Sequence, residues 1–270
     1  MDMTDLHARG LVLLGCGKMG SALLEGWLKQ GMTPAAVWVL DPVPSEWLKA
    51  QGVHLNAALP ASPAIVLIAV KPQMMAAALP QLAAMGAGQT LFLSVAAGTT
   101  IAHYESVLGA ATPIIRAMPN TPAAIGRGIT AICGNAHATP ADLALAEQLL
   151  SAVGQVVRLE GEHQIDAVTA VSGSGPAYVF HLIETLAAAG AAEGLPPALA
   201  MQLAKATVAG AGALAEAAAE EPAQLRINVT SPAGTTAAAL AVLMDETRGF
   251  PALLKEAVHA AAMRGRELGK

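Results

Sequence analysis

Residues 11–20 read Leu-Val-Leu-Leu-Gly-Cys-Gly-Lys-Met-Gly, an apolar run followed by Gly15, Gly17 and Gly20 in G-x-G-x-x-G spacing. The run predicts a buried strand, and the glycines predict a tight turn that opens a helix over 21–30. Free N–H groups at the start of such a helix can bind a pyrophosphate. Because the glycine spacing also occurs by chance, a turn without a ligand is the alternative.

The composition bears on several classes of protein. The chain has 270 residues, 54% of them hydrophobic and 13% charged, with a formal net charge of −5 and scattered cations, which does not favour nucleic-acid binding. The longest uncharged stretch, 72–104, is interrupted by proline, glycine and glutamine, so we expect no membrane span there. Two cysteines and seven dispersed histidines predict neither a disulfide framework nor a metal site. The N-terminus lacks the pattern of a secretory signal, and we expect a cytoplasmic protein.

The first part of the chain alternates apolar strands with helical segments. Unbroken apolar runs such as 65–70 are typical of a parallel sheet that is covered on both faces. We therefore predict a Rossmann-type, doubly wound, mostly parallel α/β domain over 1–161. The expected strands are 11–14, 37–40, 65–70, 91–95, 113–118, 129–133 and 156–159, with helices near 19–30, 44–51, 73–85, 100–108 and 140–152.

The remainder, 162–270, is rich in alanine and predicts helices only. They are expected over about 175–193, 197–218, 235–245 and 251–268. Small residues along these helices allow close packing, but so short a helical unit can hardly bury its apolar surface alone. We therefore expect a homodimer formed through this domain, with packing against the first domain as the alternative.

Asp41 ends the second expected strand, about twenty residues after Gly20. A carboxylate at this place can accept hydrogen bonds from the ribose hydroxyls of adenosine, and it repels a 2′-phosphate. It would then favour NADH over NADPH. Asp41-Pro42 is equally typical of a simple turn, and both interpretations stay open.

Three further expected strands end in small or proline-containing segments, at 69–72, 94–98 and 116–122. The carboxyl ends of parallel strands meet at one edge of a sheet, and open α/β sheets bind their ligands there. The sequence therefore predicts a ligand crevice at this edge.

Two segments of the helical domain, 172–178 and 228–236, place hydroxyl groups and free backbone N–H groups at helix starts. In the second, a helix that begins with Gly234, Thr235 and Thr236 suits a small carboxylate. Ordinary N-capping by Ser or Thr is the commoner use of such residues. Since no Ser-His-Asp set or close acidic pair accompanies them, hydride transfer from a cofactor is favoured over hydrolysis.

Taken together, these segments resemble pyrroline-5-carboxylate reductase. The resemblance implies reduction of the cyclic imine 1-pyrroline-5-carboxylate to L-proline by NADPH or NADH, the last step of proline biosynthesis. It also implies a helical C-terminal domain that interlocks with a partner chain, and dimers that assemble further into decamers in many members. The matching segments occur in order over nearly the whole chain: 15–20, 69–73, 94–98, 116–122, 172–178 and 228–236.

The resemblance also implies roles for individual residues. Thr236 would be the catalytic residue, with its hydroxyl directed at the ring nitrogen, and Ser231, Gly234, Thr235 and Thr236 would bind the substrate carboxylate. The residues implied to contact the cofactor are Gly15, Cys16, Gly17, Lys18, Met19, Gly20, Asp41, Asn56, Ala69, Val70, Lys71, Pro72, Val95, Ala96 and Ala97.

Two residues depart from the family pattern. Asp41 stands where many members carry Ser, Asn or Arg, so a preference for NADPH does not follow, and Ala233 replaces a glycine, which narrows the allowed backbone angles. Two other functions stay open. A β-hydroxyacid dehydrogenase would be expected to carry a catalytic lysine, which 172–190 lacks, and a nucleotide-sensing dimer would leave 231–236 without a small ligand.

Overall fold

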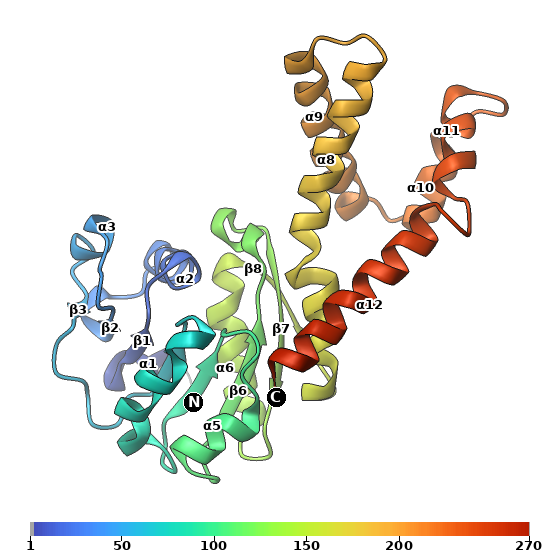
Figure 1. The fold of residues 1–270 in the computed structure, drawn as a ribbon. Coiled ribbons are helices and arrows are strands. Elements are labelled where there is room, and N and C mark those ends of the chain that lie inside the picture. Colours follow the sequence, from blue (N-terminus) through green and yellow to red (C-terminus); the bar gives the residue numbers. More distant parts are fainter. Residues whose placement is uncertain (1–2, 270) are drawn as a thin grey trace. The chain divides into compact units, whose positions relative to one another are not determined.

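The computed structural model describes residues 3–269 and contains two compact units (Figure 1). The first unit holds the described residues up to Gly173 and those from Ala262 onward, and the second is Ser174–Ala261. The sequence predicts the division at 161/162 instead. The segment just after that point lies with the first unit because Ile165 is buried in the core of the sheet.

The first unit is built on one sheet of eight strands in the order β3-β2-β1-β4-β5-β6-β7-β8. All neighbouring strands are parallel except β6 and β7, which are antiparallel. The predicted Rossmann-type, mostly parallel sheet is thus confirmed. Its strands are β1 Leu11–Leu14, β2 Val37–Leu40, β3 His54–Leu55, β4 Ile65–Ile68, β5 Leu91–Ser94, β6 Ile114–Met118, β7 Gly128–Gly134 and β8 Gly154–Arg158.

Helices cover both faces of this sheet, and each strand sends alternate side chains to opposite faces. In β1, Leu11 and Leu13 belong to one buried core, whereas Val12 and Leu14 belong to another. Because both faces are covered, β1 has no solvent side and its sequence is apolar throughout. The helices of this unit are α1 Met3–Arg9, α2 Lys18–Lys29, α3 Glu46–Lys49, α4 Met75–Ala78, α5 Ile101–Leu108, α6 Pro140–Leu150 and α7 Ile165–Val168, followed by a π-helical turn at Thr169–Gly173.

The segment expected as a single helix over 73–85 is more irregular. Two 3-10 segments, Pro72–Met74 and Leu79–Met85, flank the single turn of α4. Pro80 has no backbone N–H and its ring crowds the preceding turn, so a regular α-helix cannot continue through it.

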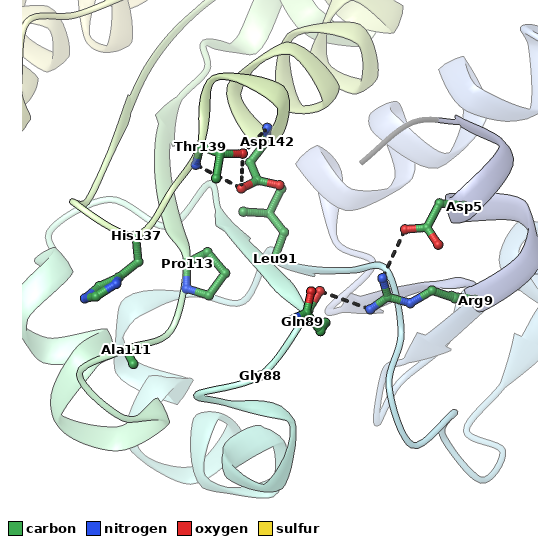
Figure 2. A pocket seen from close by; sticks show the side chains of 10 residues that line it. All are labelled: Asp5, Arg9, Gly88, Gln89, Leu91, Ala111, Pro113, His137, Thr139 and Asp142. Carbon is green, nitrogen blue, oxygen red and sulfur yellow. Dashed lines mark hydrogen bonds and ion pairs between the residues drawn. The ribbon is translucent and has the colours of Figure 1, made fainter.

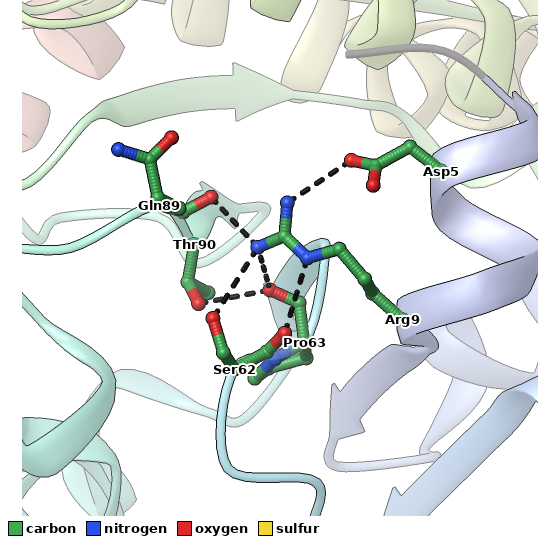
Figure 3. A network of polar contacts seen from close by, with 6 residues as sticks. All are labelled: Asp5, Arg9, Ser62, Pro63, Gln89 and Thr90. Carbon is green, nitrogen blue, oxygen red and sulfur yellow. Dashed lines mark hydrogen bonds and ion pairs between the residues drawn. The ribbon is translucent and has the colours of Figure 1, made fainter.

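Helix α1 was not among the expected elements, and Arg9 at its end fixes it to the sheet (Figure 3). The guanidinium donates to Asp5 Oδ2 and to the carbonyl oxygens of Pro63 and Gln89, each at 3.0 Å. Pro63 and Gln89 lie two residues before the first residues of β4 and β5. The contacts therefore lie at the amino-terminal edge of the sheet.

In the second unit, the regular elements of 174–261 are all helices. Helices α8 and α9 lie side by side (Figure 1), and Ala187 of α8 and Ala200 and Ala204 of α9 are buried. The four expected helices are present, and a short additional one precedes α11. The elements are α8 Gly175–Ala192, α9 Pro197–Ala217, α10 Pro222–Asn228, α11 Thr235–Leu243 and α12 Phe250–Leu268, whose last part belongs to the first unit.

Many large apolar side chains of these helices are exposed in the single chain. By length and composition alone α9 could cross a membrane, but this is weak evidence, since core helices of soluble proteins meet the same criterion. The absence of a membrane partner stays a prediction. The exposed apolar side chains of the second unit are Val179, Phe180, Leu182, Leu186, Leu195, Leu199, Leu203, Leu214, Ile227, Val229, Val242, Leu243, Met244, Phe250, Leu253 and Leu254.

Candidate active site

The glycine turn after β1 has the backbone geometry that a dinucleotide site requires. Gly15 has φ +89, and a side chain there would lie 2.8 Å from Val70 Cγ1. At Gly20 a Cβ would overlap the carbonyl oxygen of Gly15, so close packing of α2 on the turn requires glycine. Gly17 differs, because a Cβ there meets no heavy atom within 4 Å. Its side faces open space, where a pyrophosphate can approach the backbone.

Gly17 is also the N-cap of α2, and no side chain caps this helix. The first N–H groups of a helix have no partner within the helix, and together with the helix dipole they attract an anion. The residues present here therefore fit the pyrophosphate of a dinucleotide.

Asp41 and Asn56 form a connected pair beside this turn. The Cys16 N–H donates to Asp41 Oδ2 and the Val43 N–H to Asp41 Oδ1, both at 2.8 Å. The Asn56 side chain accepts from the Asp41 N–H at 2.9 Å and donates to the Asp41 carbonyl at 2.8 Å. Asp41 thus shapes a turn, as one interpretation held, and each carboxylate oxygen keeps lone pairs for a ribose hydroxyl. Ribose binding stays a prediction.

The strand ends that the sequence singled out meet at one edge. In the register of the sheet, Leu14 pairs with Leu40 and with Ile68, and Ile68 pairs with Ser94. The expected cofactor residues at 15–20, 41, 69–72 and 95–97 follow directly after these four strands. The structure therefore brings them together, at the switch point where the strand order reverses.

Cys16 lies inside the turn, and burial together with the neighbouring Asp41 carboxylate raises the pKa of its thiol to about 11. A thiol with this pKa is protonated at neutral pH and is a poor nucleophile. This favours a structural role for Cys16 in the turn over a nucleophilic one. Among the residues that the structure describes, no cluster of three or more His, Cys, Asp or Glu side chains could hold a metal ion.

The segments 116–122 and 169–173 contact each other through Asn120. Its Nδ2 donates to the Ser172 carbonyl at 3.2 Å, and its Oδ1 accepts from the Ile129 N–H at 3.0 Å. The Ser172 hydroxyl donates back to the Val168 carbonyl at 3.0 Å within the π-helical turn. Single π-turns of this kind often occur at functional sites.

The start of α11 is not an ordinary Ser/Thr cap. Its N-cap is Gly234, which follows Ala233 at φ +57, and no side chain caps the helix. Side chains of Ser45, Thr100 and Thr139 cap α3, α5 and α6, whereas α8, α9 and α10 lack a side-chain cap as α11 does. Thr236 is half-buried at the start of α11, and the N–H groups of a helix start can bind a carboxylate.

A cavity of about 430 Å³ lies elsewhere in the first unit (Figure 2). Arg9, Gln89, Pro113 and His137 are among its lining residues, and Leu91 at the start of β5 forms part of its wall. It therefore opens at the amino-terminal edge of the sheet. No residue that the sequence assigns to cofactor or substrate lines it.

Two contacts near the expected cofactor edge could not be predicted from the sequence. Arg116, buried in β6, forms an ion pair with Glu162, and Tyr104 of α5 hydrogen-bonds Ser94 at the end of β5. Burial raises the pKa of the Tyr104 hydroxyl, which stays neutral. Both contacts join residues that are distant in the chain, and no local pattern reveals them.

The sequence of this chain is similar to those of known reductases. A pyrroline-5-carboxylate reductase from Pseudomonas aeruginosa is 40% identical over 266 residues, which cover 96% of this chain and 97% of the relative. The chain belongs to the pyrroline-5-carboxylate reductase family. A second member of the family, from a Synechocystis species, is 48% identical over 206 residues, or 76% of this chain and 75% of the relative.

The fold agrees with solved structures of the pyrroline-5-carboxylate reductase family. The structure from Coxiella burnetii matches with a TM-score of 0.91 at 33% identity, covering 97% of this chain and 99% of that one. The structure from Plasmodium falciparum with NADP bound matches with a TM-score of 0.83 at 27% identity, covering 98% and 99%. Residues 162–268 match the family model described as pyrroline-5-carboxylate reductase dimerisation, and 11–98 match the one described as NADP oxidoreductase, coenzyme F420-dependent.

Proposed function

We propose that this chain reduces 1-pyrroline-5-carboxylate to L-proline with NADPH or NADH, as the last step of proline biosynthesis in the cytoplasm. The observation that carries the proposal is the uncapped start of α11 beside Thr236, in a chain whose glycine turn fits a dinucleotide. Backbone N–H groups at a helix start suit a small substrate that carries one carboxylate.

The first unit would hold the cofactor by its backbone. The N–H groups at the start of α2 would bind the pyrophosphate, and Asp41 and Asn56 would lie along the adenosine ribose. The segments 69–72 and 95–97 would flank the nicotinamide. The reduced nicotinamide supplies the hydride.

The second unit would hold the substrate. We assign the carboxylate to the segment that contains Ser231 and to the N–H groups of Thr235 and Thr236, at the positive end of the α11 dipole. The Thr236 hydroxyl would bind the ring nitrogen and so fix the face of the imine. A protonated imine already carries the proton that the product amine keeps, so a neutral hydroxyl can replace a strong acid. Positioning is then the main contribution of the protein.

The second unit would also join two chains into a homodimer. Its exposed apolar side chains lie on α8 to α12, in the region that matches the dimerisation model of the family. Exposed apolar side chains in this number favour burial against a second copy. Further assembly of dimers into decamers would follow the pattern of the family.

The experiment is a turnover assay with purified protein, 1-pyrroline-5-carboxylate, and either NADH or NADPH. We expect loss of the reduced nicotinamide absorbance and formation of proline in equal amounts. Oxidation of the cofactor by a hydroxy acid would favour a dehydrogenase instead. Cofactor binding without turnover of the imine would favour a nucleotide sensor, and either result would overturn the proposal.

A further inference from the structure

The loop between β5 and α5, residues 95–100, forms the nicotinamide side of the proposed site. A buried pair of hydroxyl groups, those of Ser94 and Tyr104, contacts this loop. The Ser94 and Tyr104 hydroxyl oxygens are 2.5 Å apart, and Ser94 Oγ also accepts the Ala96 N–H at 3.2 Å. The Thr99 side chain at the other end of the loop also lowers the pKa of the Tyr104 hydroxyl, against the larger effect of burial. Both ends of the loop are thus connected to one buried tyrosine.

The same loop is held from the side by Glu162. Glu162 Oε1 accepts the N–H of Ile101, the first residue of α5, at 2.7 Å. A carboxylate at this place satisfies an N–H that lacks a partner within the helix, and it interacts favourably with the helix dipole. The position of the loop's end therefore depends on where the Glu162 carboxylate lies.

Arg116 fixes that carboxylate. Its Nη1 forms an ion pair with the same oxygen, Glu162 Oε1, and its side chain is only 9% exposed. Arg116 is also the register partner of Ser94 across β5 and β6. The buried guanidinium of Arg116 thus fixes the position of the Glu162 carboxylate, and this carboxylate fixes the position of the first residue of α5.

The end of α12 lies against the other side of the loop. Gly98 has φ +72, and a Cβ there would be 3.5 Å from Leu268 Cβ, while one at Gly269 would be 3.7 Å from Thr100 Cγ2. Gly98, Thr100, Arg116 and Glu162 also line a cavity of about 300 Å³ in the first unit. The loop is therefore confined by three separate parts of the chain.

We propose that Arg116 and Glu162 are positioning residues for hydride transfer, which act by fixing the 95–101 segment beside the nicotinamide. The inference rests on the proposed function. Neither residue would touch the substrate or the reacting atoms. Their removal would leave the pyrophosphate turn unchanged and would misplace the nicotinamide ring, and small misplacements cost up to about 100-fold in rate.

The test compares Glu162→Ala, Glu162→Gln and the control Glu147→Ala. Glu147 of α6 forms an exposed ion pair with Arg158 of β8 in the same unit. We expect Glu162→Ala to lower kcat by roughly 10- to 100-fold while the Kd for NADPH changes by less than about threefold. We expect Glu162→Gln to recover most of kcat, because the amide oxygen can still accept the Ile101 N–H.

A primary deuterium isotope effect, measured with cofactor labelled at the transferred hydrogen, separates positioning from stability. Misplacement slows hydride transfer itself, so the isotope effect should rise in both Glu162 variants and stay at the wild-type value in Glu147→Ala. A fall in kcat that matches the loss of folded protein, with an unchanged isotope effect, would overturn the proposal. If Glu162→Ala does not fold, the test depends on Glu162→Gln, for which we expect a smaller rise in the isotope effect. An unchanged isotope effect in that variant would overturn the proposal.

Hydrogen exchange provides a readout that does not need turnover. In Glu162→Gln we expect faster exchange confined to peptides over 95–104, with and without NADPH, and none in Glu147→Ala. Unchanged exchange there would contradict the positioning role. A wild-type enzyme that is inactive toward the imine would count against the proposed function alone, and the exchange result would still decide the role of Glu162.

Discussion

Asp41 accepts a hydrogen bond from the Cys16 backbone N–H at 2.8 Å and so joins the end of β2 to the glycine turn after β1. Its other oxygen accepts the Val43 N–H. The carboxylate is therefore a structural part of the cofactor edge as well as the residue expected to meet the ribose. This double role decides which substitution tests cofactor preference.

Asp41→Asn removes the negative charge and keeps one oxygen for these N–H groups. We expect the ratio of kcat/KM for NADPH to that for NADH to rise by about 10-fold, because the variant no longer repels the 2′-phosphate of NADPH. Asp41→Ser should shift the ratio in the same direction with a larger loss of total efficiency, because its shorter side chain reaches the turn less well. Steady-state kinetics with both cofactors measure the ratio. A ratio that stays constant removes Asp41 from cofactor choice.

The glycines of the turn predict two different phenotypes. Gly17→Ala should leave the melting temperature unchanged, because the added methyl meets no protein atom, and should weaken NADPH binding at least about 10-fold by blocking the approach of the pyrophosphate. Gly20→Ala should lower the free energy of unfolding by about 1–3 kcal/mol, because its methyl overlaps the Gly15 carbonyl. Thermal unfolding and fluorescence titration separate the two. Normal NADPH affinity in Gly17→Ala would be inconsistent with the proposed pyrophosphate position.

Thr236→Ala should lower kcat by roughly 100-fold while the Kd for NADPH is unchanged, because the hydroxyl is assigned to the substrate nitrogen alone. Thr236→Ser keeps a hydroxyl at the same place and should recover most of the rate. Kinetics and cofactor titration on the same preparations provide both values. Equal kcat values in the Ala variant and the wild type would exclude the catalytic role.

Cys133 predicts a dependence of stability on alkaline pH. Burial raises the pKa of its thiol to about 11, while Arg116 lowers it and Glu162 raises it by smaller amounts. The folded state therefore keeps a proton that the unfolded chain releases near pH 9. Stability from this group is complete below about pH 9 and is lost as the pH rises to about 11, by about 2–3 kcal/mol. Cys133→Ala should show a smaller loss over this range in denaturant titrations at each pH. Parallel curves for the two proteins would refute the prediction.

Leu182 and Leu186 lie one helical turn apart on α8, and both are exposed in the single chain. Leu182→Glu combined with Leu186→Glu should convert a homodimer into monomers or weaken it at least 100-fold, because two charges would be buried in an apolar interface. Sedimentation at several protein concentrations measures the assembly. Lys205→Glu on α9 changes charge without removing apolar surface and provides the comparison. An unaltered dimer in the double variant would place the interface elsewhere.

The sheet could be predicted from the sequence because its strands are buried on both faces. A short apolar run such as 65–68, with helical segments before and after it, indicates a buried strand. The glycine turn after β1 then indicates which edge of the sheet is expected to bind the cofactor. The short elements could not be predicted. Helix α1 has seven residues and β3 has two, so neither is long enough to show a repeating spacing of apolar residues. The helix expected over 73–85 is interrupted at Pro80, where 3-10 turns take its place.

The candidate site could be predicted only where its residues follow strand ends or begin helices. The Arg116–Glu162 ion pair joins residues 46 positions apart, and the Asn120–Ser172 hydrogen bond joins residues 52 apart. Such contacts depend on the tertiary fold, and no sequence motif predicts them. The opposite holds for Ala233, whose place in a glycine-type turn predicted restricted backbone angles and whose φ is +57.

The central claim is that backbone N–H groups at the start of α11 hold the substrate carboxylate while the edge after β1, β4 and β5 holds the nicotinamide. A crystal structure with NADPH and L-proline tests it most directly. We expect the proline carboxylate on the Thr235 and Thr236 N–H groups and the ring nitrogen on the Thr236 hydroxyl. We expect the nicotinamide beside 95–97, with its reacting carbon about 3–3.5 Å from the ring carbon. Proline bound away from Thr236, or a nicotinamide outside that edge, would contradict it.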